Sequence, residues 1–400
     1  MDLRSHSPYW LLKNGLINSY PSIAEAGKTD VIVMGAGITG ALVAWHLVNA
    51  GFAVTIIDRR HAGMGSTAAS TALLQYEIDT PLHKLALKAG YAGAVKAYWY
   101  CADAVQRLRT LCDRFHMQAA YKKRPSLQYA SFASHVKSLE KEYLLRRKEG
   151  FPVAWWDQNM IRDKIGFVAP AAIYSTIGAE VDAYLLCHLL LESCLRNGAV
   201  IYDNTAVTEI RHPRRSVEVT THNGKKITGK YLVIACGYES QKYIPQKVET
   251  IHATYATVSE PMPNQQPWYR SCLIWETADP YLYMRTTSDK RILIGGLDDD
   301  FYAPDKRDAR IPQKTKKLVK AFAKKFPDIP FIPDFQWAGA FAKTKDGLPY
   351  IGSIRQRPRT YFALGFGGNG ITFSMVAAQM ICDHLAGKPN PDQAIFSFNR

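Results

Sequence analysis

The segment that most constrains the fold lies near the start of the chain, where three glycines follow a short apolar run. Gly35, Gly37 and Gly40 are spaced as Gly-x-Gly-x-x-Gly directly after residues 31–34. The apolar run predicts a buried parallel strand, and residues 41–50 predict the helix that follows it. In such a unit the first glycine makes the tight turn, the second lets the backbone approach a pyrophosphate, and the third lets the helix pack closely. The spacing therefore predicts a unit that binds a dinucleotide.

A second predicted strand (54–57) ends at an acid, Asp58. In dinucleotide-binding folds an acid at this place accepts hydrogen bonds from the ribose hydroxyls of the adenosine. Arg59 and Arg60 would suit the 2′-phosphate of NADP, but Asp58 would repel that phosphate. The complete order of strand, helix, strand and acid disfavours a mere glycine-rich turn, so the segment indicates FAD or NAD.

Length and composition allow a large core. The 400 residues, 47% of them hydrophobic, predict two domains that can interleave. No apolar run approaches the ~18 residues that span a bilayer, and the first residues lack the order of a signal peptide, so we expect a cytoplasmic protein without membrane contact. The seven cysteines and eleven histidines show no ligand spacing, so we expect neither disulfide bonds nor a metal site.

The chain is basic, with 50 Lys and Arg against 35 Asp and Glu, a net charge of +15. Such a charge attracts anionic partners, nucleic acid among them. The basic residues gather in three runs, at 122–124, 146–148 and 314–325. In the last run Leu318 and Phe322 recur at helical spacing, which predicts an amphipathic helix with solvated lysines. A nucleic-acid partner is therefore not favoured, although the charge leaves it open.

The rest of the chain alternates between helical and strand patterns. Residues 1–28 precede the first strand and should pack on the body of the protein as an extension. Helices dominate the prediction for 81–150, and alternating strands dominate for 251–337. Between them, residues 181–202 predict a second helix-strand pair, and Asn223-Gly224 predicts the turn of a hairpin.

Five ordered features make the chain resemble the FAD-dependent D-amino-acid oxidase superfamily, which includes glycine oxidase and sarcosine oxidase. They are the fingerprint with Asp58, the strand ending at 235–237, Gly295-Gly296, the segment 344–352, and residues 365–372 before the last helix. The resemblance covers nearly everything after residue 29. It implies FAD rather than NAD, because the family directs the N-terminal end of that last helix at the flavin C2 carbonyl.

The resemblance also implies the architecture. We expect an α/β protein in which a Rossmann-like FAD-binding domain of the GR2 type is interleaved with a substrate domain of mixed β-sheet and helices. Residues 29–90, 166–250 and 338–400 are assigned to the FAD-binding domain, and 91–165 and 251–337 to the substrate domain. The residues expected to contact FAD are Gly35, Gly37, Ile38, Thr39, Gly40, Asp58, Arg59, Ser66, Thr67, Val207, Ala235, Gly237, Gly368, Asn369, Gly370, Ile371 and Thr372.

The implied reaction is hydride transfer from the carbon beside an amine to flavin N5. It gives an imine that water hydrolyses, and dioxygen or another acceptor reoxidises the flavin. Where sarcosine oxidase carries a cysteine bonded to the flavin, this chain has Gly339. The loop that carries a flavin-linked histidine in dimethylglycine dehydrogenases reads Ser66-Thr67-Ala68, so we expect noncovalent FAD.

The positions that bind a substrate carboxylate in relatives lack basic residues here. Sarcosine oxidase's lysine and arginine match Thr372 and Gln75, and the two arginines of glycine oxidase match Phe341 and Gly368. A small α-amino acid would therefore lose its usual clamp. We name Arg285 as a replacement clamp, with a solvent-facing strand residue as the alternative, and we count Arg285, Gln75 and Thr372 as candidate catalytic residues.

Other candidates concern the amine and the electron acceptor. Glu77 and Asp79 could receive a cationic amine, although such acids are often solvated loop residues. Aromatic strand residues are more often core, but three of them are candidates to line the pocket: Tyr281, Tyr283 and Trp337. The lysine that assists oxygen reduction in sarcosine oxidase falls near Leu293, which leaves a dehydrogenase open.

The sequence thus favours an FAD-dependent oxidoreductase acting on a small-molecule amine or amino acid. One alternative is an RNA-modifying flavoprotein, because a tRNA wobble-uridine enzyme contains a domain of this superfamily. Another is a flavin-binding protein with little turnover, its pocket filled by its own side chains such as Tyr9 and Trp10. The substrate, the acceptor and the oligomeric state stay open.

Overall fold

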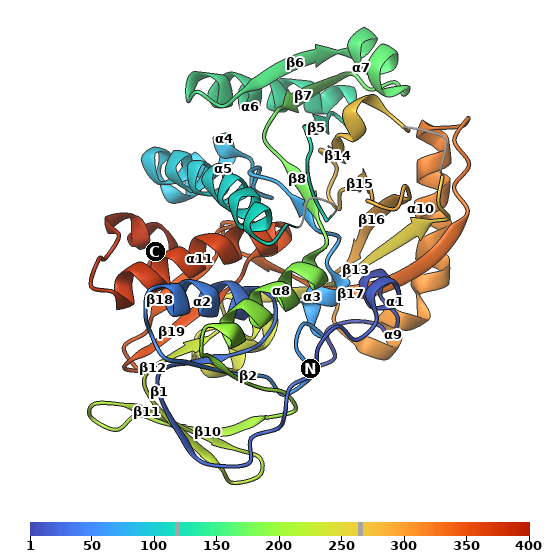
Figure 1. Cartoon of the computed structure of the whole chain (residues 1–400). Helices are drawn as coiled ribbons and strands as arrows, with labels where there is room; N and C mark the ends of the chain where they lie inside the picture. Colours follow the sequence, from blue (N-terminus) through green and yellow to red (C-terminus); the bar gives the residue numbers. More distant parts are fainter. Residues whose placement is uncertain (117–119, 263–266) are drawn as a thin grey trace.

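Two large sheets organise the chain (Figure 1). The computed structural model describes residues 1–116, 120–262 and 267–400. The strands of these residues form two eight-stranded sheets and one sheet of three strands. Helices pack on both large sheets, so the α/β class expected from the sequence is confirmed.

The first sheet is built around the glycine fingerprint. Its strands are β1 (Gly27–Met34), β2 (Val54–Ile57), β9 (Val200–Tyr202), β10 (Val207–Arg211), β11 (Val217–Thr221), β12 (Lys226–Ile234), β18 (Tyr350–Ser353) and β19 (Thr360–Leu364). The strands β19, β12, β1, β2 and β9 run parallel, whereas β10, β11 and β18 pair antiparallel. The expected hairpin at Asn223-Gly224 joins β11 to β12, and Gly224 has a positive φ of 77°, which glycine adopts without strain.

Strand β1 shows why this sheet is apolar on both faces. Val31 and Val33 pack into the cluster that contains the helices α2 (Ile38–Asn49), α8 (Ala183–Arg196) and α11 (Gly370–Leu385). Ile32 and Met34 alternate to the other face and pack with β11, β12 and β19. Helix α2 contacts both α8 and α11 (Figure 1), so the first and last glycine-rich turns lie in one layer.

The second sheet is almost wholly antiparallel. Its order is β17 (Pro333–Thr344), β13 (Glu249–Ser259), β16 (Ile292–Asp299), β15 (Tyr283–Thr286), β14 (Leu273–Glu276), β5 (Ser126–Tyr129), β7 (Ala171–Ser175) and β6 (Val153–Asp157). Helix α10 (Ile311–Lys325) covers β13, β16 and β17 with Leu318 and Phe322 buried, as its apolar spacing predicts. Its Lys314 is an exception to the solvated lysines, because it is buried against Leu297 O (2.6 Å) and Asp299 (2.8 Å).

The other elements connect these sheets. The three-stranded sheet has the order β3 (Leu73–Leu74), β8 (Ala179–Val181) and β4 (Tyr121–Lys123). The remaining α-helices are α1 (Tyr9–Asn14), α3 (Ser66–Ala69), α4 (Leu82–Ala89), α5 (Tyr91–Arg114), α6 (Val136–Lys148), α7 (Gln158–Ile165) and α9 (Pro304–Ala309). Short 3-10 helices are η1 (Ala133–His135), η2 (Gly237–Tyr243), η3 (Tyr269–Ser271), η4 (Gly367–Asn369) and η5 (Pro391–Phe396).

Sheet membership differs from the expected domain ranges at three places. Strand β7 lies in the range 166–250, which the sequence assigned to the FAD-binding domain, yet it pairs between β5 and β6 in the second sheet. Strand β17 extends the second sheet to residue 344, past the expected boundary at 337. Helix α5, from the range 91–165, packs on α11 instead of on the second sheet. The range 81–150, expected to be mostly helical, also contains β4 and β5.

The extension 1–28 packs on the body of the protein, as expected. Ser5 N donates to Ala338 O (2.9 Å) and Ala340 N donates to Leu3 O (2.8 Å), so these residues lie as a short bridge along β17. Helix α1 follows, and Trp10 is buried with its indole N–H donating to Ser70 O (2.6 Å).

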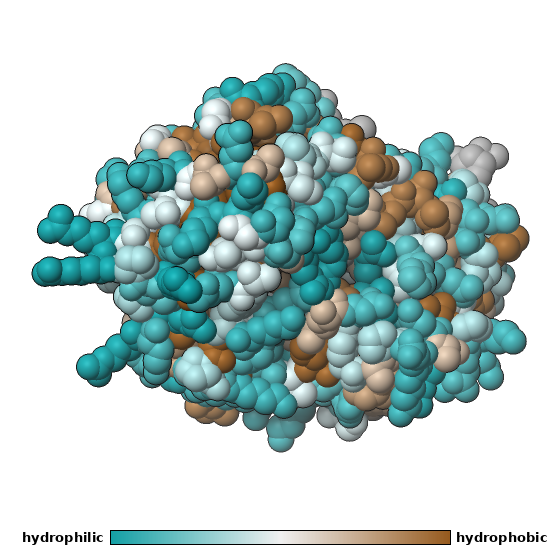
Figure 2. All heavy atoms as spheres, turned by 90° about the horizontal axis from the view of Figure 1, so that it is seen from below, coloured by the Kyte–Doolittle hydropathy of each residue, from teal (hydrophilic) through white to brown (hydrophobic). Residues whose placement is uncertain are grey.

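The face of the molecule shown in Figure 2 is mainly hydrophilic. On the face shown in Figure 2, hydrophobic residues occur in small scattered groups among hydrophilic ones. Of the helices in the described part of the chain, none combines the length and apolar character that crossing a bilayer requires. The seven cysteines are free, and all but Cys236 are buried.

Candidate active site

One large pocket is lined by residues of both eight-stranded sheets. It encloses about 2160 Å³ of space, part of it open to solvent. Its walls include the carboxyl ends of β1, β2 and β12, the start of α2 and α11, and parts of β13, β16 and β17. In open α/β sheets the carboxyl ends of parallel strands are the usual place for a ligand, so this pocket is the candidate active site.

The glycine fingerprint forms one end of the pocket through very close packing. Gly35 has φ 111°, and a Cβ there would lie 2.5 Å from Ala235 O. A Cβ at Gly40 would lie 1.8 Å from Gly35 O. Only glycine fits these two positions, and the result is a helix α2 whose first turn comes directly against the end of β1.

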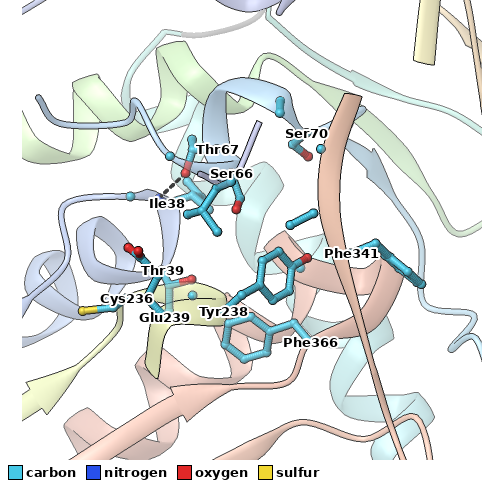
Figure 3. A pocket seen from close by; sticks show the side chains of 18 of the residues that line it. Ile38, Thr39, Ser66, Thr67, Ser70, Cys236, Tyr238, Glu239, Phe341 and Phe366 are labelled. Atoms are coloured by element: carbon cyan, nitrogen blue, oxygen red, sulfur yellow. Dashed lines mark hydrogen bonds between the residues drawn. The ribbon is translucent and has the colours of Figure 1, made fainter. Parts of the chain in front are cut away.

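The first turn of α2 presents backbone N–H groups toward the pocket. Gly37 is its N-cap and supplies no side-chain cap, while Thr67 Oγ1 accepts from Ile38 N (2.9 Å), the bond drawn in Figure 3. A Cβ at Gly37 would lie 3.0 Å from the same hydroxyl oxygen. Because helix N-termini are electropositive, this end suits a phosphate group.

Asp58 lies beside the fingerprint and is held by the backbone. Its carboxylate accepts from Ala36 N (2.7 Å) and from Arg60 N (2.8 Å), and burial raises its pKa. Arg59 and Arg60 both pair with Glu239, the latter at 3.0 Å. Both guanidinium groups are therefore already engaged by a carboxylate, which argues, together with the adjacent Asp58, against a 2′-phosphate. Glu239 was not predicted from the sequence.

The structure brings most of the predicted cofactor residues together. The following line the pocket: Gly35, Gly37, Ile38, Thr39, Asp58, Arg59, Ser66, Thr67, Val207, Ala235, Gly237, Gly368, Gly370 and Ile371. Gly40, Asn369 and Thr372 do not. Asn369 Nδ2 and Thr372 Oγ1 instead donate to Gln75 O, at 3.1 and 3.2 Å, so both residues position the segment after β3 and do not line the pocket.

The glycine-rich turn before α11 packs closely against the side chain of Asp79. The carboxylate of Asp79 accepts from Gly368 N (2.8 Å) and from the Tyr281 hydroxyl (3.1 Å). Cβ atoms at Gly367 or Gly368 would each lie 2.7 Å from this carboxylate, which explains the run of glycines. Asp79 is therefore neither a solvated loop acid nor freely available to a substrate.

Two further acid and base candidates face away from the pocket. Arg285 is 1% exposed, pairs with Glu180 (3.7 Å) and lies over the Trp10 ring (5.4 Å). It is neither the expected clamp nor a solvent-facing residue, because α1 and β8 cover this end of β15. Glu77 is likewise buried, 3.8 Å from Arg146 and outside the pocket wall.

The aromatic candidates do line the pocket. Tyr281, Tyr283 and Trp337 are part of its wall, and the indole N–H of Trp337 donates to Ala69 O (2.9 Å). Gln75 also lines the pocket, whereas Leu293 is fully buried in the core. Tyr9 and Trp10 lie outside the wall, so they do not fill the pocket.

The sequence analysis missed several residues of the wall besides Glu239. Among them, Tyr238 and Phe366 bring their rings together in the middle of the pocket, with Phe341 opposite (Figure 3). Asp298, also missed, adds a carboxylate to the part of the wall that includes Tyr281 and Tyr283. The acidic run 298–300 after the Gly295-Gly296 pair was the available signal, but it does not say which acid faces inward.

The chain is similar in sequence and in fold to several known proteins. The family model described as FAD dependent oxidoreductase matches residues 30–384. The gamma-glutamylputrescine oxidoreductase of Escherichia coli (strain K12) is 25% identical, over 95% of this chain and 89% of that protein. The crystal structure of glycine oxidase from Geobacillus kaustophilus has a TM-score of 0.77 at 21% identity, over 94% of this chain and 99% of that one. The L-alpha-glycerophosphate oxidase of Mycoplasma pneumoniae, solved with FAD bound, has a TM-score of 0.74 at 16% identity, over 92% and 98%.

Proposed function

Because the chain belongs to the family of FAD-dependent oxidoreductases, we propose that it oxidises a C–N bond of a small amine. The cofactor is FAD, and when bound it accepts a hydride from the substrate carbon. The amine loses that hydride and a proton from its nitrogen, which leaves an imine. Water then hydrolyses the imine to a carbonyl compound and a second, smaller amine or ammonia.

The residues present fit FAD. The missing side chain of Gly37 leaves room for a pyrophosphate beside the first turn of α2, which would offer it N–H groups. Asp58 is placed for the adenosine ribose. Gly370 and Ile371 put the start of α11 in the pocket wall, where its electropositive end would stabilise negative charge on the flavin ring. The aromatic rings of Tyr238 and Phe366 would keep water from the reacting atoms.

The observation that supports an amine is the charge distribution of the wall. The basic residues lining the pocket are Arg59, Arg60 and Lys242, and the first two are paired with Glu239 at the fingerprint end. At the other end the wall carries aromatic rings and the Asp298 carboxylate. Gln75, Phe341 and Gly368 stand in this wall where relatives bear cations, so at these positions of the described wall a substrate carboxylate meets no basic side chain.

We therefore expect amines without an α-carboxylate to reduce the flavin at least as fast as glycine, sarcosine or D-alanine. One charge-assisted hydrogen bond contributes roughly 1.5 to 3 kcal/mol, and each ~1.4 kcal/mol is a factor of ten. An amino acid that lacks even one such contact should thus react about ten-fold more slowly. The measurement is the rate of flavin bleaching under anaerobic conditions across a panel of amines and amino acids.

If sarcosine or a D-amino acid instead reduced the flavin faster than every amine without a carboxylate, at equal FAD content, the pocket would contain a carboxylate clamp and the expectation would be wrong.

The cofactor should be bound noncovalently. Gly339 lines the pocket where the family's cysteine would stand, and Ala68 replaces the linked histidine, so neither position offers a nucleophile. We expect the purified protein to be yellow and to release its FAD into the supernatant on acid precipitation, measured by absorbance. Colour that stays with the precipitate would contradict this.

The RNA-modifying alternative would need basic residues to converge at the pocket opening. Within the described wall the unpaired basic side chain is Lys242. The run on α10 does not form one free patch either, since Lys314 is engaged by Asp299. The amine reaction is therefore the better supported function.

A further inference from the structure

An irregularity in β16 decides which acid enters the pocket. Tyr255 of β13 lies opposite Gly296, and Ala253 lies opposite Asp299. Two residues of β16 therefore stand where β13 has only Thr254, which is a β-bulge. Leu297, inside the bulge, has a φ of 57°, a left-handed conformation that is strained for a leucine. Bulges of this kind re-aim side chains next to functional sites.

The bulge reverses the facing of the residues that follow it. Before it, Leu293 packs on the side of α2 and α11, and Ile294 packs on the side of α10. Regular alternation would continue with residue 297 toward the pocket and residue 298 toward α10. Instead Leu297 packs with the α10 cluster and Asp298 lines the pocket. Asp299 then returns to α10, where Lys314 (2.8 Å) and Arg310 (3.0 Å) pair with it.

The Asp298 carboxylate brings negative charge that its surroundings do not neutralise. The basic groups that act on it are Lys343 and His252. Each of them is paired elsewhere in the described structure, with Asp279 (3.3 Å) and Asp300 (3.0 Å) respectively. A half-buried carboxylate without its own counter-ion is costly, so a cation entering the pocket would relieve that cost.

The neighbours of Asp298 suit an ammonium group. Tyr238, Tyr281 and Tyr283 line the same pocket as Asp298, and the charge of Asp298 raises the pKa of their hydroxyls further, beyond the larger effect of burial. Aromatic faces attract cations, most strongly where water is excluded. Asp79 accepts a hydrogen bond from the Tyr281 hydroxyl (3.1 Å), and its negative charge adds to that of Asp298.

This ammonium is better assigned to a group that does not react. An amine that gives up a hydride must be uncharged at its nitrogen, and a carboxylate beside that nitrogen would raise its pKa and favour the charged form. A carboxylate that binds a remote ammonium has no such disadvantage. It would position the substrate and leave the reacting nitrogen free to lose its proton.

We propose that the pocket selects diamines, and that Asp298 is the specificity-determining residue that binds the ammonium group remote from the oxidised C–N bond. The proposal rests on the amine oxidation proposed above and names its substrate class. Asp79, which is already bonded to Tyr281 and Gly368, acts as a positioning residue.

The test compares α,ω-diamines of three to six carbons with monoamines of the same length, using the FAD-loaded protein. Dissociation constants are measured by calorimetry, and flavin reduction is followed anaerobically. We expect the best diamine to bind the wild-type protein about ten- to a hundred-fold more tightly than its matched monoamine, as one charge-assisted hydrogen bond would give. In Asp298→Asn this preference should disappear, so that the diamine and its matched monoamine bind with similar dissociation constants.

Asp328→Asn is the matched control. It removes an equal charge from an exposed side chain outside the pocket wall, so it should keep the diamine preference. FAD content reports whether each variant is folded. A wild-type protein without diamine preference, or an Asp298→Asn protein that retains it, would overturn the proposal.

The two proposals can fail separately. If monoamines reduce the flavin and diamines bind no better, amine oxidation stands and the role of Asp298 falls. If no amine reduces the flavin but diamines bind through Asp298, the binding site stands and amine oxidation falls.

A pH series gives a check that needs no variant. Burial raises the pKa of Asp298, and the negative charge of Asp79 raises it further. The hydrogen bond with the Thr254 hydroxyl and the charges of Lys343 and His252 lower it, but the net pKa lies above the usual value of an aspartate. Diamine binding should therefore weaken as the pH falls through this raised pKa, because the carboxylate becomes neutral while the ammonium groups stay charged. Diamine binding that stays constant down to the ordinary range of an aspartate would contradict the assignment.

Discussion

Gly37→Val should reduce the FAD content of the purified protein to less than about a tenth of the wild-type value. A Cβ at this position would already lie 3.0 Å from Thr67 Oγ1, the acceptor of the Ile38 N–H group. The two methyl groups of valine would extend from there into the pocket, where a pyrophosphate needs close approach to the backbone. FAD content is measured by absorbance after release, and far-UV circular dichroism reports the fold, which we expect to persist in large part.

Gly27→Val is the matched control for this experiment. Gly27 opens β1, its backbone does not require glycine, and a Cβ there would meet nothing within 4 Å. This variant should keep its FAD. If the Gly37→Val protein were as yellow as the wild type, the phosphate site would lie elsewhere in the pocket.

Arg146→Met should lower the free energy of unfolding by about 3 to 5 kcal/mol, the usual cost of breaking a buried ion pair. Arg146 is fully buried on α6 and pairs with Glu142 (2.7 Å) and Glu77 (3.8 Å). Despite burial, the charge of Arg146 and hydrogen bonds from His83 lower the pKa of Glu142 to about 2. Without Arg146, two buried carboxyl groups would lose their cation.

The same variant should also loosen the segment that leads into the pocket. Glu142 accepts from Leu82 N (2.8 Å) and His83 N (2.9 Å), at the end of the segment that carries Gln75 and Asp79. Urea denaturation of the FAD-loaded protein measures the stability. Arg147→Met is the matched control, since this neighbour is exposed and only donates to the Tyr143 hydroxyl. Equal stability losses in both variants would mean that the buried network contributes nothing specific.

The buried ion pairs of Arg146 could not be predicted from the sequence. In the sequence, 146–148 is simply a run of three basic residues, whereas in the structure Arg146 turns inward and pairs with Glu142, one helical turn earlier. A pattern of charges gives no information on the acid it will meet from another segment. Glu77, 69 positions before Arg146, is the second partner because the fold brings these two segments together.

The cofactor end of the pocket could be predicted because its determinants are local. The turn at Gly35, the N-terminus of α2 and Asp58 belong to one continuous strand-helix-strand unit, whose geometry follows from the spacing of the residues. The glycines before α11 could be added because their order along the chain matched the superfamily. The fold class and FAD followed from these short-range patterns.

The substrate end depended on contacts between distant segments. Regular alternation along β16 would send Asp298 toward α10, and only the bulge against β13 turns it into the pocket. Arg285, named as a clamp, is instead covered by α1 and β8, which lie far from it in the sequence. Local spacing thus determined the cofactor fold, because neighbouring residues set backbone geometry. Tertiary structure alone decided which charges face the substrate, because side-chain direction there depends on strand register and on the segments that cover each strand.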